Sequence, residues 1–106
     1  MLAARRASPQ QSQFLALLSN DCEPDVAAFL WDELAVYWHP ITPHPDDDFL
    51  MDLSIDHDEP EDWLFRFCKM NRLNIVEVQP WQPDWPTTVR QLARWLSEER
   101  LRQTAK

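Results

Sequence analysis

Glycine is missing from all 106 residues of this chain, whereas soluble proteins contain about 7% of it. Glycine is the residue that most easily adopts a positive φ angle. Its absence therefore argues against a glycine-rich phosphate-binding loop and against hairpins built on Asn-Gly turns. Nine prolines mark the breaks between elements instead.

Cysteine and long apolar runs are also scarce. Cys22 and Cys68 are too few and too far apart for a disulfide framework or a zinc ribbon, so we expect two small apolar residues in a reducing compartment. No apolar run reaches the roughly 18 residues of a membrane-spanning helix. Residues 10–13 are polar and interrupt any signal-peptide core. We expect a cytoplasmic protein without a membrane partner.

Lysine and arginine are absent between Asp21 and Asp62, a stretch that holds fourteen Asp and Glu residues. Eight Lys and Arg and four acidic residues follow from Trp63 onward, and the whole chain has a formal charge of −8 at pH 7. That charge argues against nucleic acid as a partner. Two arrangements are consistent with this charge asymmetry. Acidic and basic residues could form two opposed faces, or a basic C-terminal helix could lie against the acidic half.

Apolar spacings of three and four residues predict an all-α fold of three main helices and a short N-terminal one. We divide the chain into residues 1–20, a tail with a short helix starting at Ser8-Pro9, and residues 21–106, a helical domain. The second helix runs from Asp21 to Trp38 and ends before Pro40. The residues predicted to form its buried face are Val26, Phe29, Leu30, Leu34 and Tyr37.

The third helix starts at Asp58, with Asp58 and Glu61 at capping-box spacing, and ends at Asn71 as a left-handed cap. The last helix starts after Thr87 or Thr88. Its arginines are expected on the outer side. The apolar stripe of the third helix is predicted to be Trp63, Leu64, Phe67, Cys68 and Met70, and that of the last helix Val89, Leu92, Ala93 and Leu96.

The connections are expected to be irregular. Residues Phe49–Ile55 read as a single turn, and Leu73–Val78 as an extended loop, since a lone strand would have nothing to pair with. Pro80–Pro86 contains two tryptophans. This loop is either a lid over one end of the core or an exposed recognition patch.

Phe49–Asp58 and Pro86–Leu96 are two stretches that together resemble the acyl carrier protein family. Phe49–Asp58 is similar to the carrier signature around the serine that bears phosphopantetheine, and Pro86–Leu96 is similar to the entry of the last carrier helix. With the Val26–Tyr37 helix, the resemblance covers roughly residues 22–97. It implies a small acyl-carrier-protein-like helical bundle from a bacterium.

The sequence departs from the carrier pattern at the modified position. His57 stands where the serine would be, and it has no hydroxyl to carry a phosphodiester. Ser54 lies three positions too early. We therefore expect no prosthetic group and no other cofactor.

The Asp- and His-rich stretch does not fit other chemistry either. The run from Asp56 to Asp62 lacks the glycine of a calcium loop and contains Pro60. His44 with Asp46 or Asp48 matches no known zinc spacing. Carboxylates in a solvated, proline-broken stretch do not form a catalytic pair. We expect no metal site and no enzyme.

The acidic surface Asp46–Asp62 is predicted to dock a protein partner with a basic patch. A merely solvated face, stabilised by the helix dipole, explains the same residues. An alternative function is a small acidic inhibitor or immunity-type protein that binds a basic partner. Trp63 would serve as an aromatic anchor if it were exposed. The candidate partner-binding residues are Asp56, His57, Asp58, Glu59, Glu61, Asp62 and Trp63.

Overall fold

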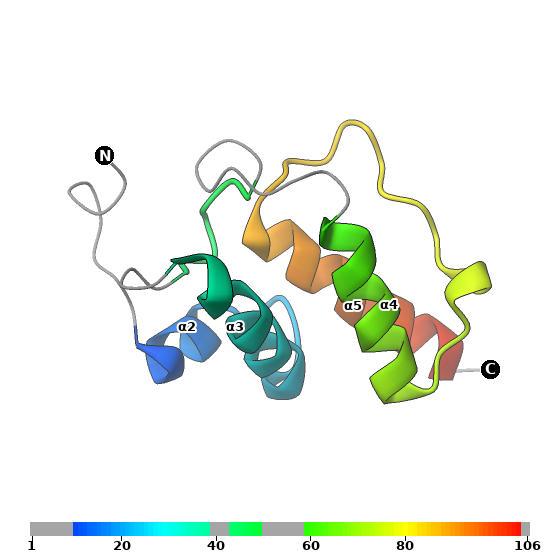
Figure 1. Ribbon diagram of the computed structural model, residues 1–106, viewed down its shortest axis with the longest axis horizontal. Helices are drawn as coiled ribbons and strands as arrows, with labels where there is room; N and C mark the ends of the chain where they lie inside the picture. The colour runs from blue at the N-terminus through cyan, green and yellow to red at the C-terminus, as the bar shows by residue number, and fades with distance from the viewer. Residues whose placement is uncertain (1–9, 39–42, 50–58, 105–106) are drawn as a thin grey trace.

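The computed structural model describes residues 10–38, 43–49 and 59–104. Within these ranges the chain is all-α, as predicted, with one short and three longer helices (Figure 1). The acyl-carrier arrangement of these helices stays a prediction. In chain order, the elements are α2 (Gln11–Leu17), α3 (Pro24–Trp38), α4 (Glu59–Asn71), the 3₁₀ turn η1 (Ile75–Glu77) and α5 (Val89–Thr104).

Helix α2 is an arm that packs on α3. Its start is stabilised by the Gln13 side-chain oxygen, which accepts the Gln10 backbone N–H at 2.8 Å; the predicted start at Ser8-Pro9 lies outside the described residues. Phe14 and Leu18 are fully buried, and the Phe14 ring lies 5.3 Å from that of Trp31. The arm thus covers one side of α3 with these two side chains.

Helix α3 begins at Pro24, three residues after the predicted start at Asp21, and ends at Trp38 as predicted. Pro24 takes the first helical position, where its missing N–H costs no hydrogen bond. The Glu23 carbonyl accepts the N–H groups of Val26 and Ala27, which closes the first turn. The residues that α3 buries in the core are Val26, Ala27, Phe29, Leu30 and Leu34.

Helix α4 buries a stripe at the predicted spacing, but Met70 is not part of it. Its side chain is 70% exposed, so that prediction was wrong. The predicted capping residue Asp58 lies outside the described residues. The stripe that α4 places in the core is Trp63, Leu64, Phe67 and Cys68.

The left-handed cap of α4 is Arg72, with φ 57°, and not Asn71. Asn71 stays helical because its side chain donates to the Phe67 carbonyl at 2.9 Å and accepts from Arg100 at 3.1 Å. Leu73 N–H then bonds the Cys68 carbonyl at 2.8 Å, which reverses the chain. A non-glycine residue in the left-handed region costs about 1–2 kcal/mol. The hydrogen bond to the Cys68 carbonyl at the end of α4 offsets this cost.

The connection from α4 to α5 contains η1 where the sequence predicted an extended loop. The Asn74 side chain caps this turn by accepting Val76 N–H at 3.0 Å. This local bond outweighs the alternating apolar pattern because no neighbouring strand is there among the described residues to reward an extended chain. Further on, Trp81 and Trp85 are half-buried and pack on the core, as expected of a lid.

Helix α5 is capped by Thr88, whose hydroxyl accepts Gln91 N–H at 3.1 Å. The segment Pro45–Phe49 lies along this helix start. The Val89 N–H bonds the Asp47 carbonyl at 3.0 Å, and the Arg90 N–H bonds the Pro45 carbonyl at 2.7 Å. The four residues predicted for the inner face are fully buried, and Trp95 joins them: Val89, Leu92, Ala93, Leu96 and Trp95.

Arg94 of α5 is 52% exposed, as predicted, but Arg90 and Arg100 are largely covered, so the prediction of an outer side was wrong for these two. In the α2–α3 turn, one carboxylate oxygen of Asp21 accepts a hydrogen bond from Arg90 at 2.5 Å, and the other accepts one from Arg94 at 2.6 Å. The Asp21 side chain is only 1% exposed. Of the two arrangements allowed by the charge pattern, the basic helix against the acidic half is therefore the one that forms.

The same contact continues one and two turns along α5. Ser97 donates to Glu23 at 2.5 Å, and Arg100 binds both oxygens of Asp25 at 2.6 and 2.9 Å. The Ser97 bond holds the pKa of Glu23 below its ordinary value, and the Arg100 bond does the same for the pKa of Asp25. Four positions of α5 thus hold the start of α3.

Replacing Asp21 by Asn should destabilise the fold by about 1–3 kcal/mol, because it removes the buried charge that pairs two guanidinium groups. Urea unfolding followed by circular dichroism measures the loss. The matched control is Asp84→Asn on the exposed 82–86 loop, which should stay within about 0.5 kcal/mol of the parent chain. Equal stabilities for both variants would contradict the role given to Asp21.

Stability should fall as the pH drops below about 4.5. The folded pKa values of Glu23 and Asp25 lie below their ordinary values of 4.5 and 3.8, so the unfolded chain binds protons first. The stabilisation is complete above the ordinary values and is lost as the pH falls through the lowered folded values. Urea midpoints measured between pH 6 and pH 3 test this, and Arg100→Gln should flatten the profile.

Candidate functional site

The structure describes part of the predicted partner-binding set. Asp56, His57 and Asp58 lie outside the described residues, and so does the side chain of Glu59. Glu61 and Asp62 are exposed in the first turn of α4, as a docking role requires. His57, a residue without a hydroxyl, does not fit a phosphopantetheine attachment whatever its surroundings.

Trp63 does not meet the condition set for an anchor. It is 0% exposed, and its ring lies 6.2 Å from that of Phe49 in the core. The reason is helical periodicity, because Trp63 shares the inward stripe with Phe67 four residues later. The prediction of Trp63 as a partner-binding residue is therefore wrong.

Phe65 is the aromatic residue that α4 exposes. Its side chain is 56% exposed and lies on the same face as Glu61 and Asp62, four and three residues earlier. Sequence reasoning missed it because it lies between Trp63 and Phe67 in an almost continuous apolar run. The signal was available, since a residue two positions from a buried one points the opposite way on a helix.

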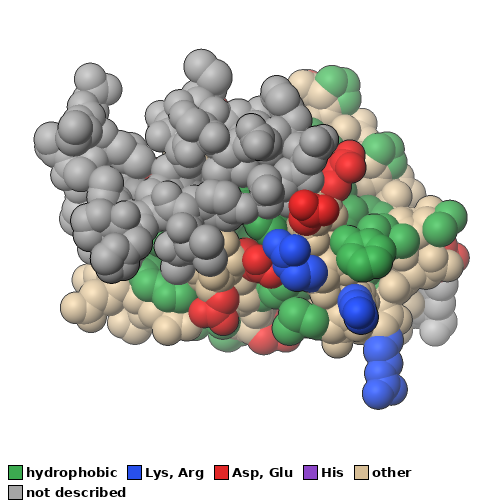
Figure 2. Space-filling view, in the orientation of Figure 1, with side chains coloured by type: hydrophobic (Ala, Val, Ile, Leu, Met, Phe, Trp, Pro, Cys, Tyr) green, Lys and Arg blue, Asp and Glu red, His purple; other side chains and the backbone are tan. Residues whose placement is uncertain are grey.

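The surface around Phe65 combines α3 and α4. Arg66 binds both oxygens of Glu33 on α3, at 2.6 and 2.9 Å, and joins the two helices. Figure 2 shows acidic, hydrophobic and Lys or Arg side chains gathered on this side of the molecule. We call the following exposed residues the α3–α4 face: Asp32, Glu61, Asp62, Phe65 and Met70.

A shallow acidic groove lies within that face. It has a volume of about 390 Å³ and runs between the two helices, with Ala28 and Phe29 on the apolar side. Asp25 and Glu33 line it with carboxylates that are already paired with Arg100 and Arg66. Asp32 adds an exposed carboxylate, and Met70 forms a flexible thioether wall. The Asp32 carboxylate over an apolar floor fits a basic, partly apolar surface.

The first part of the predicted acidic surface is engaged in contacts within the chain, although Asp46 stays exposed. Asp47 is buried and accepts the His44 backbone N–H at 3.0 Å. Asp46 binds Arg90 at 3.0 Å, and Asp48 accepts the Thr87 hydroxyl at 2.7 Å. This correction to the range Asp46–Asp62 leaves the described docking charge at the start of α4.

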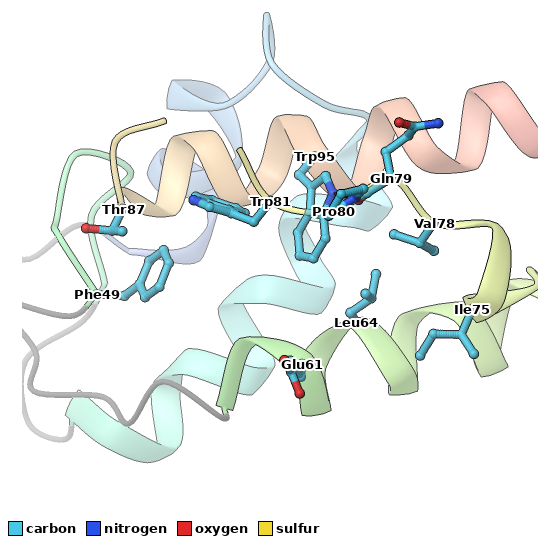
Figure 3. A pocket seen from close by; sticks show the side chains of 10 residues that line it. All are labelled: Phe49, Glu61, Leu64, Ile75, Val78, Gln79, Pro80, Trp81, Thr87 and Trp95. Atoms are coloured by element: carbon cyan, nitrogen blue, oxygen red, sulfur yellow. The ribbon is translucent and has the colours of Figure 1, made fainter. Parts of the chain in front are cut away.

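A second, larger groove opens on the other side of α4, with a volume of about 500 Å³. In Figure 3, Leu64 rises from α4 towards Val78 and Pro80 on the opposite side, and Glu61 lies on α4 at the edge of the groove. Trp81 and Trp95 close the far end together with Phe49. Its walls are thus mostly aromatic and aliphatic.

The aromatic wall is built around Trp81. Its ring lies 6.0 Å from Phe49, 5.3 Å from Trp85 and 5.3 Å from Trp95, each time nearly perpendicular. Such edge-to-face contacts add about 0.5–1.5 kcal/mol per pair beyond burial. The Pro80–Pro86 loop is therefore both lid and groove wall.

Side chains of α5 hold the opposite wall through its backbone. Trp95 Nε1 donates to the Gln79 carbonyl at 2.9 Å, and Glu99 accepts the Gln79 N–H at 2.9 Å. Gln103 pairs in the same two-way manner with Asn74, at 2.8 and 3.0 Å. The helix thus fixes an irregular segment as a neighbouring strand would, and the groove is preformed.

The described residues contain no group of His, Cys, Asp and Glu arranged to hold a metal ion. His44 Nδ1 accepts the Asp46 backbone N–H at 3.1 Å. The lone pair of this nitrogen is therefore engaged in a hydrogen bond and is not directed at a zinc ion. Among the same residues, no helix is long and apolar enough to cross a bilayer.

Comparisons with known proteins found no matching family model, no matching curated protein and no matching solved structure. The acyl-carrier resemblance therefore rests on the two sequence stretches alone.

The two thiols are free and buried, and neither is set up as a nucleophile. Burial, followed by the charges of Glu23, Asp21 and Asp25, raises the pKa of Cys22 from its ordinary 9.0 to about 12. Burial also raises the pKa of Cys68. Because the thiolate is the reactive form, both side chains serve packing.

Cys22 should therefore react slowly with iodoacetamide in the native chain. At pH 8, a pKa of about 12 leaves about one thiol in 10⁴ ionised, against about one in ten at 9.0. We expect labelling at least about a hundredfold slower than in urea, measured by mass spectrometry on a Cys68→Ala variant. Equal rates in buffer and in urea would refute this description of Cys22.

Proposed function

We propose that this chain is a non-catalytic protein-interaction domain that docks a partner with a basic patch on the α3–α4 face. The observation that supports it most is Phe65, an aromatic side chain left 56% exposed directly beside the carboxylates of Glu61 and Asp62. The same helix buries its other two aromatic side chains, Trp63 and Phe67, in the core. Leaving one outside suits a surface that a partner covers.

Phe65 supplies the anchor that an interface needs. Binding energy concentrates in a few central aromatic or arginine side chains that are fully desolvated in the complex. A phenylalanine offers a large apolar area with little conformational freedom to lose. Met70, 70% exposed, adds a side chain that adapts to the shape of the partner.

The charge around the anchor selects the partner. Arg66, Arg90, Arg94, Arg100 and Arg102 all take part in ion pairs within the chain. Much of the basic charge is thereby spent internally, and Asp32, Glu61 and Asp62 remain exposed and outnumber the exposed Lys69 on α4. Opposite potentials steer association and exclude like-charged partners.

Within this proposal the domain is carrier-like in architecture and lacks the prosthetic group. The order of α3, a long connection, α4, a connection and α5 supports it, together with the two stretches that resemble carriers. His57 in place of the serine supports the loss of the attached arm. Docking through the start of the helix after that position is then what remains of the carrier role.

The second candidate is a small acidic inhibitor or immunity-type protein that covers a basic partner. The formal charge of −8 and the acidic groove between α3 and α4 favour it. Both candidates use the same face, so the identity of the partner separates them. A fatty-acid or polyketide enzyme supports the first, and a basic nuclease supports the second.

Phe65→Ala should weaken partner binding by at least about 2 kcal/mol, or roughly thirtyfold, because it removes the proposed anchor. Capture of the identified partner by immobilised parent and variant chains measures this, followed by titration calorimetry. Val76→Ala is the matched control, since Val76 is 86% exposed on η1, away from the face. Equal losses for both variants, or no loss for either, would reject the face.

The missing prosthetic group has its own test. Incubation with a phosphopantetheinyl transferase and coenzyme A should leave the intact mass of the chain unchanged. A gain equal to the phosphopantetheine arm would overturn this part of the proposal.

A further inference from the structure

The groove between α4 and the 75–81 connection is mostly apolar, with a charged residue at one edge. Glu61 lies at its α4 side with Leu64 one turn further along, and Val78 and Pro80 face Leu64 in Figure 3. Among the described residues that line the groove, Glu61 is the one that carries a charge. Its side chain is exposed and free to meet an occupant at the mouth.

The aromatic end of the groove is closed and apolar, so the charge of an occupant is decided at the other end. Trp81 stands perpendicular to both Phe49 and Trp95, with interplanar angles of 82° and 89°. In such edge-to-face pairs the edge of one ring covers the face of the next. Phe49 and Trp95 are also buried, so this end offers contacts to apolar carbon and not to a charged group.

The helix dipole at the start of α4 would favour an anion, but the nearby carboxylates outweigh it. The dipole of a helix places about half a positive charge at its N-terminus. Glu61 and Asp62 bring two full negative charges to the same turn. The net potential at the mouth is therefore negative, so a carboxylate head group would be repelled there.

The walls are rigid enough to select an occupant. Trp95 and Glu99 fix both backbone groups of Gln79, and Arg102 binds the Glu77 carbonyl. The groove therefore does not need to be ordered at the moment of binding. A preformed cavity retains more of the gross interaction as affinity.

We propose that this groove receives a Lys or Arg side chain of the basic partner. The aliphatic stem lies along Leu64 and Val78, and the charged end meets Glu61 at the groove mouth. The inference deepens the proposed function and rests on it for the protein nature of the partner. Glu61 then belongs to both surfaces, because it lies on the α3–α4 face and at the groove mouth.

Three probes of equal chain length test the chemistry of the groove without the partner. They are hexylammonium, 1-hexanol and hexanoate, titrated into the ¹⁵N-labelled full chain at pH 7 and followed by NMR. The signals are the indole N–H groups of Trp81 and Trp95 and the amides of Leu64 and Val78. Trp31, which packs against α2, serves as the spectator.

Hexylammonium should bind about two- to fivefold more tightly than 1-hexanol, the effect of one exposed ion pair, and hexanoate should bind most weakly. Glu61→Gln should remove the preference for the cation and leave the affinity for 1-hexanol unchanged. Glu98→Gln, which removes an exposed carboxylate of α5 outside the groove, should keep the preference. The 1-hexanol titration shows in each variant that the groove is still formed.

Tighter binding of hexanoate, equal binding of the cation and the alcohol, or no shift of the groove signals by any probe would overturn the inference. Failure of the proposed function looks different. Phe65→Ala then leaves partner capture intact while the cation preference of the groove persists. If instead Phe65→Ala abolishes capture and the probes show no preference, the face holds and the groove assignment falls.

Discussion

The guanidinium group of Arg90 joins three separate parts of the chain. It binds the buried Asp21 carboxylate in the α2–α3 turn, the Leu17 carbonyl at the end of α2 and Asp46 in the segment before Phe49. A carboxylate at 1% exposure requires strong partners, because its desolvation alone costs several kcal/mol. Arg90 and Arg94 provide them from consecutive turns of α5. This contact sets the position of α5, and the positions of both candidate surfaces follow from it.

The groove depends indirectly on the position of α5. With α5 held against α3 by its arginines, its other side is left to pack on α4 and to hold the 73–80 connection. Trp95, Glu99 and Gln103 then lie in register with Gln79 and Asn74. One helix therefore uses two of its faces for two kinds of polar contact, while Val89, Leu92 and Leu96 fill the core between them.

Much of the helical framework could be predicted from the sequence because apolar spacing is a local signal. The inward residues of α3, α4 and α5 follow periods of three and four, and Pro24 and Thr88 mark two of the starts. The fate of polar residues could not be predicted, because it depends on neighbours far along the chain. Arg90 appears solvent-facing on a helical projection, yet its partner is 69 residues away.

The candidate site shows the same division. Exposure of Glu61 and Asp62 followed from helix periodicity, and the exposure of Phe65 followed from it too, although the neighbouring apolar residues concealed it. The groove had no signature, because Phe49, Trp81 and Trp95 come from three segments that only tertiary packing brings together. Arg72 took the left-handed position for a similar reason, since Asn71 was already engaged by Phe67 and Arg100.

The dependence on α5 also has a consequence for synthesis. Residues 10–88 are made before any partner of Asp21, Asp25 or Gln79 has left the ribosome. At about 5–20 residues per second, the sixteen residues of α5 add about one to three seconds in which α3 and α4 expose their apolar stripes. Folding of this chain is therefore a late event that follows translation of its last helix. A nascent chain that stops before Val89 lacks Arg90, Arg94 and Arg100, and so leaves Asp21 and Asp25 without these ion pairs.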